Sequence, residues 1–276
     1  MLSSTLAAFG SIGPASAVKL TSMLLAFGLL ISTIEHLSCW YEFQTGGIYS
    51  WKILSTNWNE KRFMLGTRAM AVVFDFPGIL VVYGIQAAAA AAILLQASSP
   101  GVPRLPLILL GATQLLVKFR YGFGEDGSDQ MKTVIALPLA LYAVAPSSLL
   151  GDAALLFIAL QSCLAYTAAG IAKASSRIWR SGEAVFAILN TRSYGNAALA
   201  RCLRDARCLK LGLAWSVIVL ETLFPLCVIV HPPLFWVFLL WGLGFHIFCA
   251  FFMGLNNFVW AFVATYPALL FVRQLI

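Results

Sequence analysis

The amino-acid sequence predicts an all-α protein: a polytopic transmembrane helix bundle with about seven or eight spans and with amphipathic helices at the membrane interface. The first observation is composition, because 61% of the 276 residues are hydrophobic and 11% are charged, whereas about 25% charged residues is usual in soluble domains. The second is the mean hydropathy of +0.87. The third is that the net charge of +7 falls in the connections between apolar stretches, which indicates membrane orientation rather than nucleic-acid binding.

We predict a single transmembrane domain over residues 1–276. The expected spans cover residues 20–37, 69–96, 105–119, 129–146, 150–173, 211–230, 234–253 and 256–274. No Lys/Arg-rich start precedes Lys19, so we expect a retained first span rather than a cleaved signal. In the second span Asp75 and Pro77 predict a kink that carries an inward-facing acid. Glu221 stands one turn before Pro225 in the sixth span and repeats this arrangement.

Two longer connections are expected to lie in the interface. Residues 39–68 alternate aromatic side chains with Gly, Asn and Lys, a pattern that suits the headgroup layer. Residues 175–210 are amphipathic and rich in arginine, and they predict a pair of surface helices whose charges attract anionic headgroups.

The basic residues also predict an orientation. Nearly all Lys and Arg lie in 39–68, 118–133 and 173–210, whereas the other side has little beyond Lys19, Arg104 and Arg273. The positive-inside rule places the basic side in the cytoplasm.

Neither a metal site nor a redox-active cysteine pair is expected. The six cysteines show no C-x-x-C spacing, which argues against a structural zinc site or a thioredoxin-like pair. His36, His231 and His246 are scattered and lack the spacing that places ligands on one helical face, so a metal-dependent oxidase ranks last.

The most informative stretch is 166–182, at the end of the fifth span. Tyr166, Gly170 and Lys173 are spaced by four and then three residues, so they share a helix face. Lys173 is there either as an active base or as an interfacial anchor, and the spacing alone leaves both open. His246 shares a face with Asn257 in the last apolar run, and both are expected to point inward because an unpaired polar group in hydrocarbon costs several kcal/mol.

Several short motifs resemble one family. They are Gly46-Gly47-Ile48 with Ser50-Trp51, the Gly-Ser-Asp-Gln region at Asp129, Ala169-Gly170-Ile171-Ala172-Lys173 followed by Trp179 and Gly182, Glu221 with Pro225, and Phe245-His246 through Met253-Gly254. Together they resemble the HTTM family, the membrane domain shared by vitamin K-dependent gamma-glutamyl carboxylase and many bacterial proteins. The resemblance covers most of the chain in order.

The resemblance implies an enzyme with a polar cavity in the membrane. Its catalytic residues would be Lys173, His246 and Asp129, with Lys173 as the base because burial disfavours the ammonium form. The residues implied for substrate binding are Tyr166, Arg120, Asp126, Trp179, Glu221, Asn256 and Asn257. The cofactor would be a quinol such as a vitamin K-type hydroquinone. The lipid bilayer, a small peptide substrate and a partner protein are the expected partners, in a multi-pass protein of the bacterial plasma membrane that matures a peptide toxin.

The chain departs from the family pattern in three ways. Ser128 or Asp129 stands where the carboxylase has a histidine, and the chain ends at Ile276 without the carboxylase's large lumenal domain. The family also places its lysine outside, whereas the charge bias places Lys173 inside. We keep both orientations open, with a lean toward the family's.

A different class of function is a non-enzymatic transporter, or an immunity or binding protein. The ionisable residues Glu35, Asp75 and Glu221 in apolar stretches are compatible with a permeation path, although no inverted repeat is evident. The pair Glu35 and His36 near the end of the first span is a weaker site candidate, with interfacial snorkelling as the alternative.

Overall fold

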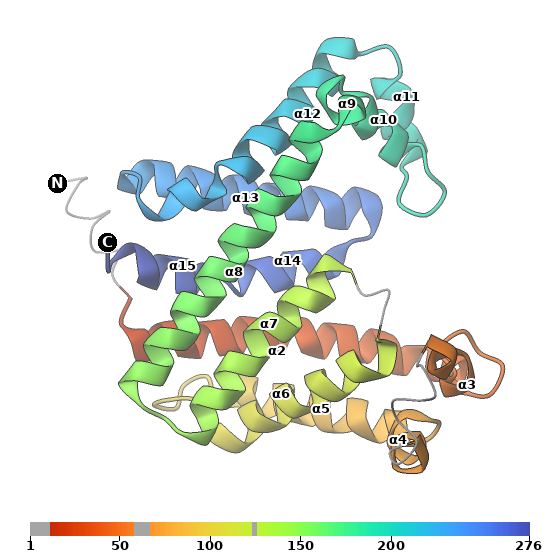
Figure 1. The fold of residues 1–276 in the computed structure, drawn as a ribbon, viewed down its shortest axis with the longest axis vertical. Helices are drawn as coiled ribbons and strands as arrows, with labels where there is room; N and C mark the ends of the chain where they lie inside the picture. Colours follow the sequence, from red (N-terminus) through yellow and green to blue (C-terminus); the bar gives the residue numbers. More distant parts are fainter. Residues whose placement is uncertain (1–11, 58–66, 123–125) are drawn as a thin grey trace. The chain divides into compact units, whose positions relative to one another are not determined.

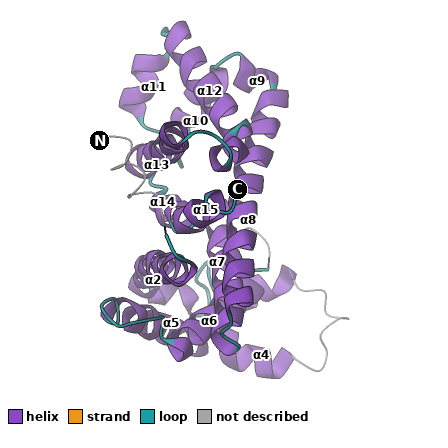
Figure 2. Cartoon of the chain, turned by 90° about the vertical axis from the view of Figure 1, so that its left-hand side faces the viewer, coloured by secondary structure: helices purple, strands orange, loops and turns teal. Residues whose placement is uncertain are grey.

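The computed structural model describes residues 12–57, 67–122 and 126–276, and the regular secondary structure within these ranges is helical with no strand (Figure 2). The predicted all-α class is therefore confirmed for the described part of the chain. Within the same ranges, four helices are long and apolar enough to cross a membrane: α2 (Pro14–Ser38), α5 (Gly78–Leu95), α8 (Ser148–Ser175) and α13 (Pro232–Met253). The larger number of seven or eight spans stays a prediction.

Two compact units can be distinguished in the chain. One comprises the described residues within Pro14–Leu155, and the other comprises Leu156–Ile276. We call them the N-terminal and the C-terminal unit. The long helix α8 contributes its first turns to the former and the rest to the latter.

The N-terminal unit is a bundle of long helices. Between α2 and α5 lie the short helices η1 (Trp40–Phe43), α3 (Trp51–Leu54), η2 (Ser55–Asn57) and α4 (Thr67–Phe74), and α5 is followed by α6 (Arg104–Tyr121) and α7 (Gly127–Val144) (Figure 1). Helix α5 packs against α2 and α6, and α6 packs against α7. A Cβ atom at Gly111 would overlap that of Ala140, so the glycine permits the close approach of α6 and α7.

The predicted span 69–96 is divided in the structure. Helix α4 ends at Phe74 and α5 begins at Gly78, so the expected kink is a complete break. Pro77 explains it, because proline lacks an N–H and collides with the preceding helical turn. The acid at this break, Asp75, is exposed and accepts a hydrogen bond from the Phe76 amide, rather than facing inward as we predicted.

The C-terminal unit continues from α8 through α9 (Arg177–Arg180), α10 (Glu183–Leu189), α11 (Ala197–Leu203), α12 (Arg207–Thr222) and η4 (Phe224–Val228) to α13, α14 (Asn256–Val263) and α15 (Tyr266–Arg273). The predicted interfacial pair over 175–210 is thus a set of three short helices. The chain turns at Gly254, whose φ of 72° is left-handed, a conformation that glycine adopts without strain.

Two predicted spans of this unit are interrupted. The span 211–230 ends as an α-helix at Thr222 and continues as the 3-10 helix η4, which contains Pro225. The span 256–274 breaks at Ala264 and Thr265, before Pro267 in the first turn of α15. In both places a proline removes a helical hydrogen bond.

Candidate functional site

A cavity of about 560 Å³ lies within the C-terminal unit, between α8, α10, α12, α13 and α14. Its wall is almost entirely apolar. The aromatic residues of this wall are Tyr166, Trp179, Trp241, Phe245, Phe248, Phe258 and Phe262. The polar groups are few, as is usual for pockets that bind small apolar molecules, and four of them form two pairs.

The first pair is an ion pair between α8 and α12. Lys173 Nζ lies 2.6 Å from Glu221 Oε2, and the Glu221 side chain is 4% exposed while that of Lys173 is 19% exposed. The ammonium also lies 5.3 Å from the centre of the Trp179 ring, within the range of a cation–π interaction. Lys173 therefore points toward a carboxylate and an aromatic ring in the cavity wall.

A glycine permits the helix approach that forms this pair. Gly170 is one turn before Lys173, and a Cβ atom there would overlap Thr222 and lie 2.9 Å from the carbonyl carbon of Glu221. Only a residue without a side chain lets α8 and α12 come this close.

The second pair joins α8 to α13. The Tyr166 hydroxyl lies 2.8 Å from His246 Nε2, and both residues are buried. The phenol ring stacks on Phe224 at 3.9 Å, and the imidazole stacks on Phe262 at 4.5 Å. A phenol that donates to Nε2 leaves the proton of a neutral imidazole on Nδ1. Nδ1 is buried without a hydrogen-bond partner, so it offers an unused donor beside the cavity.

The structure thus brings together part of the predicted site. Lys173, His246, Tyr166, Trp179 and Glu221 all line the cavity. Two further candidates, Asn256 and Asn257, stand at the start of α14 between the lining residues Leu255 and Phe258 but do not themselves line the wall. The Asn257 Oδ1 atom is buried without a partner.

The other predicted site residues belong to the N-terminal unit. Asp129 forms an ion pair of 2.8 Å with Lys132, one turn further along α7. Asp126 caps α7 by accepting hydrogen bonds from the amides of Ser128 and Asp129. The described contacts of Asp129 and Asp126 are therefore local to α7.

Arg120 is fully buried in the N-terminal unit. Its Nε donates to the Phe74 carbonyl at 2.9 Å, and its Nη2 donates to the Tyr49 carbonyl. The guanidinium also lies 5.1 Å from the centre of the Phe43 ring. These contacts attach the segment after α2 and the end of α4 to α6, which is a structural role.

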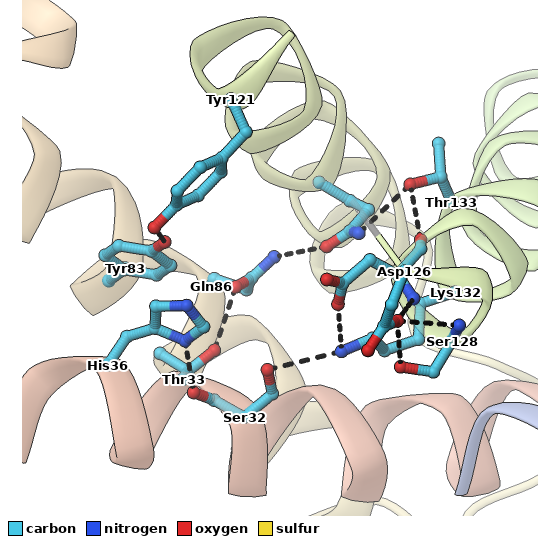
Figure 3. Close-up of polar contacts among 12 residues, drawn as sticks. Ser32, Thr33, His36, Tyr83, Gln86, Tyr121, Asp126, Ser128, Lys132 and Thr133 are labelled. Atoms are coloured by element: carbon cyan, nitrogen blue, oxygen red, sulfur yellow. Dashed lines mark hydrogen bonds and ion pairs between the residues drawn. The ribbon is translucent and has the colours of Figure 1, made fainter. Parts of the chain in front are cut away.

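Sequence reasoning missed a buried polar chain in this unit (Figure 3). Thr33 donates to Gln86 at 2.8 Å, Gln86 to Gln114 at 3.0 Å, and Gln114 to Thr133 at 3.1 Å. Lys132, which is only 2% exposed, donates to Ser32. The signal that could have revealed the chain is a single glutamine within each of two apolar helices, α5 and α6.

His36 lies beside this chain. Its Nδ1 is 2.7 Å from the Ser32 carbonyl, and its ring stacks on Tyr83 at 5.0 Å. The neighbouring Glu35 is exposed. The two residues that we considered together therefore face different surroundings.

Within the described ranges, no group of three His, Cys, Asp or Glu residues is placed to hold a metal ion, and the six cysteines are free thiols. Comparisons with known protein families, with characterised proteins and with solved structures found no match to this chain.

Proposed function

We propose that this chain is a multi-pass membrane enzyme, similar in kind to the HTTM family, that modifies a lipophilic quinol-like or peptide substrate in the cavity of the C-terminal unit. The observation that carries the proposal is the Lys173–Glu221 pair of 2.6 Å in the wall of an otherwise apolar cavity of about 560 Å³. The cavity has room for an apolar molecule, and its polar groups are concentrated at two places. A bacterial plasma membrane and a peptide partner belong to the same proposal.

The pair supplies a base in two steps. The Lys173 ammonium first transfers a proton to the Glu221 carboxylate, which leaves a neutral amine and a neutral acid. An apolar wall favours this neutral form relative to water, because removing charges from water is costly. The amine then takes the proton of a substrate hydroxyl and becomes an ammonium beside the new substrate anion.

His246 and Tyr166 would hold the other end of the substrate. With Nε2 occupied by the Tyr166 hydroxyl, the free Nδ1–H of His246 can donate to a substrate oxygen. Such a donor stabilises negative charge that develops on oxygen in a site from which water is excluded.

The test uses a vitamin K-type hydroquinone as the probe, with the protein reconstituted in vesicles. Binding is followed by quenching of tryptophan fluorescence, and turnover by chromatographic loss of the hydroquinone under air. We expect Lys173→Ala to bind the probe but to lose turnover by about 10²-fold or more, the usual contribution of a general base. Lys210→Ala is the matched control, because Lys210 also forms a 2.7 Å ion pair, with Glu183, in the same unit. Equal turnover by wild type and Lys173→Ala would reject the base assignment.

A second candidate is a non-enzymatic transporter, or an immunity or binding protein. It is favoured by the fact that Lys173 and Glu221 neutralise each other, which is also what a purely structural pair does. Uptake of the same probe into sealed vesicles separates the two functions, since a transporter moves it across the membrane unchanged whereas an enzyme converts it without vectorial flux.

A further inference from the structure

The segment between α8 and α12 has an apolar inner side. Leu189 of α10 packs with Ala200 and Leu203 of α11 in one buried cluster, and Met253 of α13 packs against it. Trp179 of α9 and Leu189 of α10 also line the cavity. This segment, residues 177–207, is therefore a wall of the cavity, and we call it the arginine cap.

The outer side of the arginine cap is strongly basic. Six exposed arginines occur within it: Arg177, Arg180, Arg192, Arg201, Arg204 and Arg207. Arg180 is partly engaged, because its Nη1 donates to the carbonyls of Ala174 and Ser175 at the end of α8. The other five arginines form no ion pair with an acid in the described part of the chain.

Few acids oppose these charges. Glu183 is already paired with Lys210 at 2.7 Å, which leaves Asp205 as the remaining acid within residues 177–207. Bulky apolar side chains are exposed between the arginines: Ile178 is 60% exposed and Tyr194 is 51% exposed. Exposed apolar residues among arginines are typical of a segment that lies in the lipid headgroup region.

The position of the arginine cap in the chain indicates which kind of surface it contacts. Arg177 follows two residues after α8, which is long and apolar enough to cross a membrane. A spanning helix ends near the headgroup layer, so the first arginines of the cap must lie there too. The position of this segment therefore favours a bilayer surface as its partner over nucleic acid or a soluble protein.

We propose that the arginine cap binds the phosphate groups of anionic phospholipids and holds this wall of the cavity against the bilayer surface. The inference rests on the proposed membrane location of α8, but not on the proposed catalytic role of Lys173. Each arginine near an anionic surface contributes on the order of fivefold to the local preference for anionic lipid at low salt.

Brominated lipids provide the test, because bromine on an acyl chain quenches a nearby tryptophan. The full chain is placed in nanodiscs of phosphatidylcholine with a minor fraction of phosphatidylglycerol, with bromine on one lipid or on the other. The contribution of Trp179 is obtained by difference from Trp179→Phe. We expect brominated phosphatidylglycerol to quench Trp179 several-fold more, per mole of lipid, than brominated phosphatidylcholine does. The preference should fall as salt is raised, because salt screens exposed charges.

A triple variant localises the effect. Arg177→Gln, Arg201→Gln and Arg204→Gln together should abolish the preference for phosphatidylglycerol. Arg104→Gln, at an exposed arginine that begins α6 in the other unit, should leave the preference unchanged. Equal quenching by the two lipids in the wild type would overturn the proposal. A preference for phosphatidylglycerol that persists at high salt would overturn it as well, and neither result depends on the triple variant. If neither lipid quenched Trp179, α8 would not end at a bilayer surface, and the proposed membrane location would fail with it.

Discussion

Lys173 and Glu221 form an ion pair of 2.6 Å although they lie 48 positions apart in the sequence and on different helices. The pair joins α8 to α12 on the wall of the cavity, at the place where Gly170 lets the two helices approach. The contact therefore has a structural consequence as well as a proposed chemical one, and the two can be measured separately.

Removing one partner of the pair should destabilise the protein. Glu221→Leu leaves the Lys173 ammonium without its counter-charge, and the loss is expected to be about 2–3 kcal/mol, toward the lower end for buried pairs because Lys173 keeps some exposure. Thermal unfolding in detergent measures it. The double variant Lys173→Met with Glu221→Leu should recover most of the loss, because no unpaired charge remains. If the double variant lost as much free energy of unfolding as Lys173→Met and Glu221→Leu lose in sum, the two side chains would not be coupled.

The approach of α8 and α12 can be tested without touching either charge. Gly170→Ala places a Cβ atom into Thr222, so the helices must separate, at an expected cost of about 1–3 kcal/mol. Turnover or binding in the cavity should fall as well, because the Lys173–Glu221 distance increases. Gly212→Ala on α12 is the control, since a Cβ atom at Gly212 meets no other atom within 4 Å. Equal unfolding temperatures for the two variants would contradict the close crossing.

The sequence predicts the helical class and the ionisable candidates better than it predicts their partners. Composition alone indicates helices in a membrane, and Lys173, Glu221, Tyr166 and His246 each stand out as polar groups in apolar stretches. Which of them meet depends on the crossing of helices that are distant in sequence, and periodicity within one helix carries no such information. The spacing rule for Tyr166 and Lys173 correctly placed both on the cavity side of α8.

The burial of Lys132, in contrast, was not predicted. It is a charged residue near the start of the expected span 129–146 and was not among the site candidates, yet it is only 2% exposed in the structure. Its burial follows from the start of α7 at Gly127, which turns residue 132 toward Ser32 of α2. The division into two compact units was likewise not predicted, because no change in composition marks it.

The glutamine pair of the N-terminal unit should behave as a coupled unit. Gln114→Leu removes the acceptor of Gln86 and the donor to Thr133, and an unsatisfied buried amide costs about 1–3 kcal/mol. Replacing Gln86 and Gln114 together by leucine should cost less than the sum of the two single changes, because no amide is then left unpaired. The free energies of unfolding of the wild type, the two single variants and the double variant together give the coupling energy. An additive result would mean that the chain in Figure 3 does not act cooperatively.

Two exposed thiols allow the orientation of the arginine cap to be determined directly. Cys202 and Cys208 are exposed at the two sides of the turn between α11 and α12, whereas Cys227 and Cys249 are buried. The connection from α8 to α12 is short enough to follow the positive-inside rule, which holds best for loops of up to about 60 residues. The positive-inside rule places this connection in the cytoplasm, whereas the family resemblance, toward which we lean, places it on the outer side. If the charge rule holds, a membrane-impermeant maleimide added to intact cells should leave Cys202 and Cys208 unlabelled until the membrane is permeabilised. The variant Cys202→Ser with Cys208→Ser identifies the signal, because any labelling that comes from these two residues should be absent from it. Labelling of intact cells at these two residues would place the cap, and with it Lys173, on the outer side.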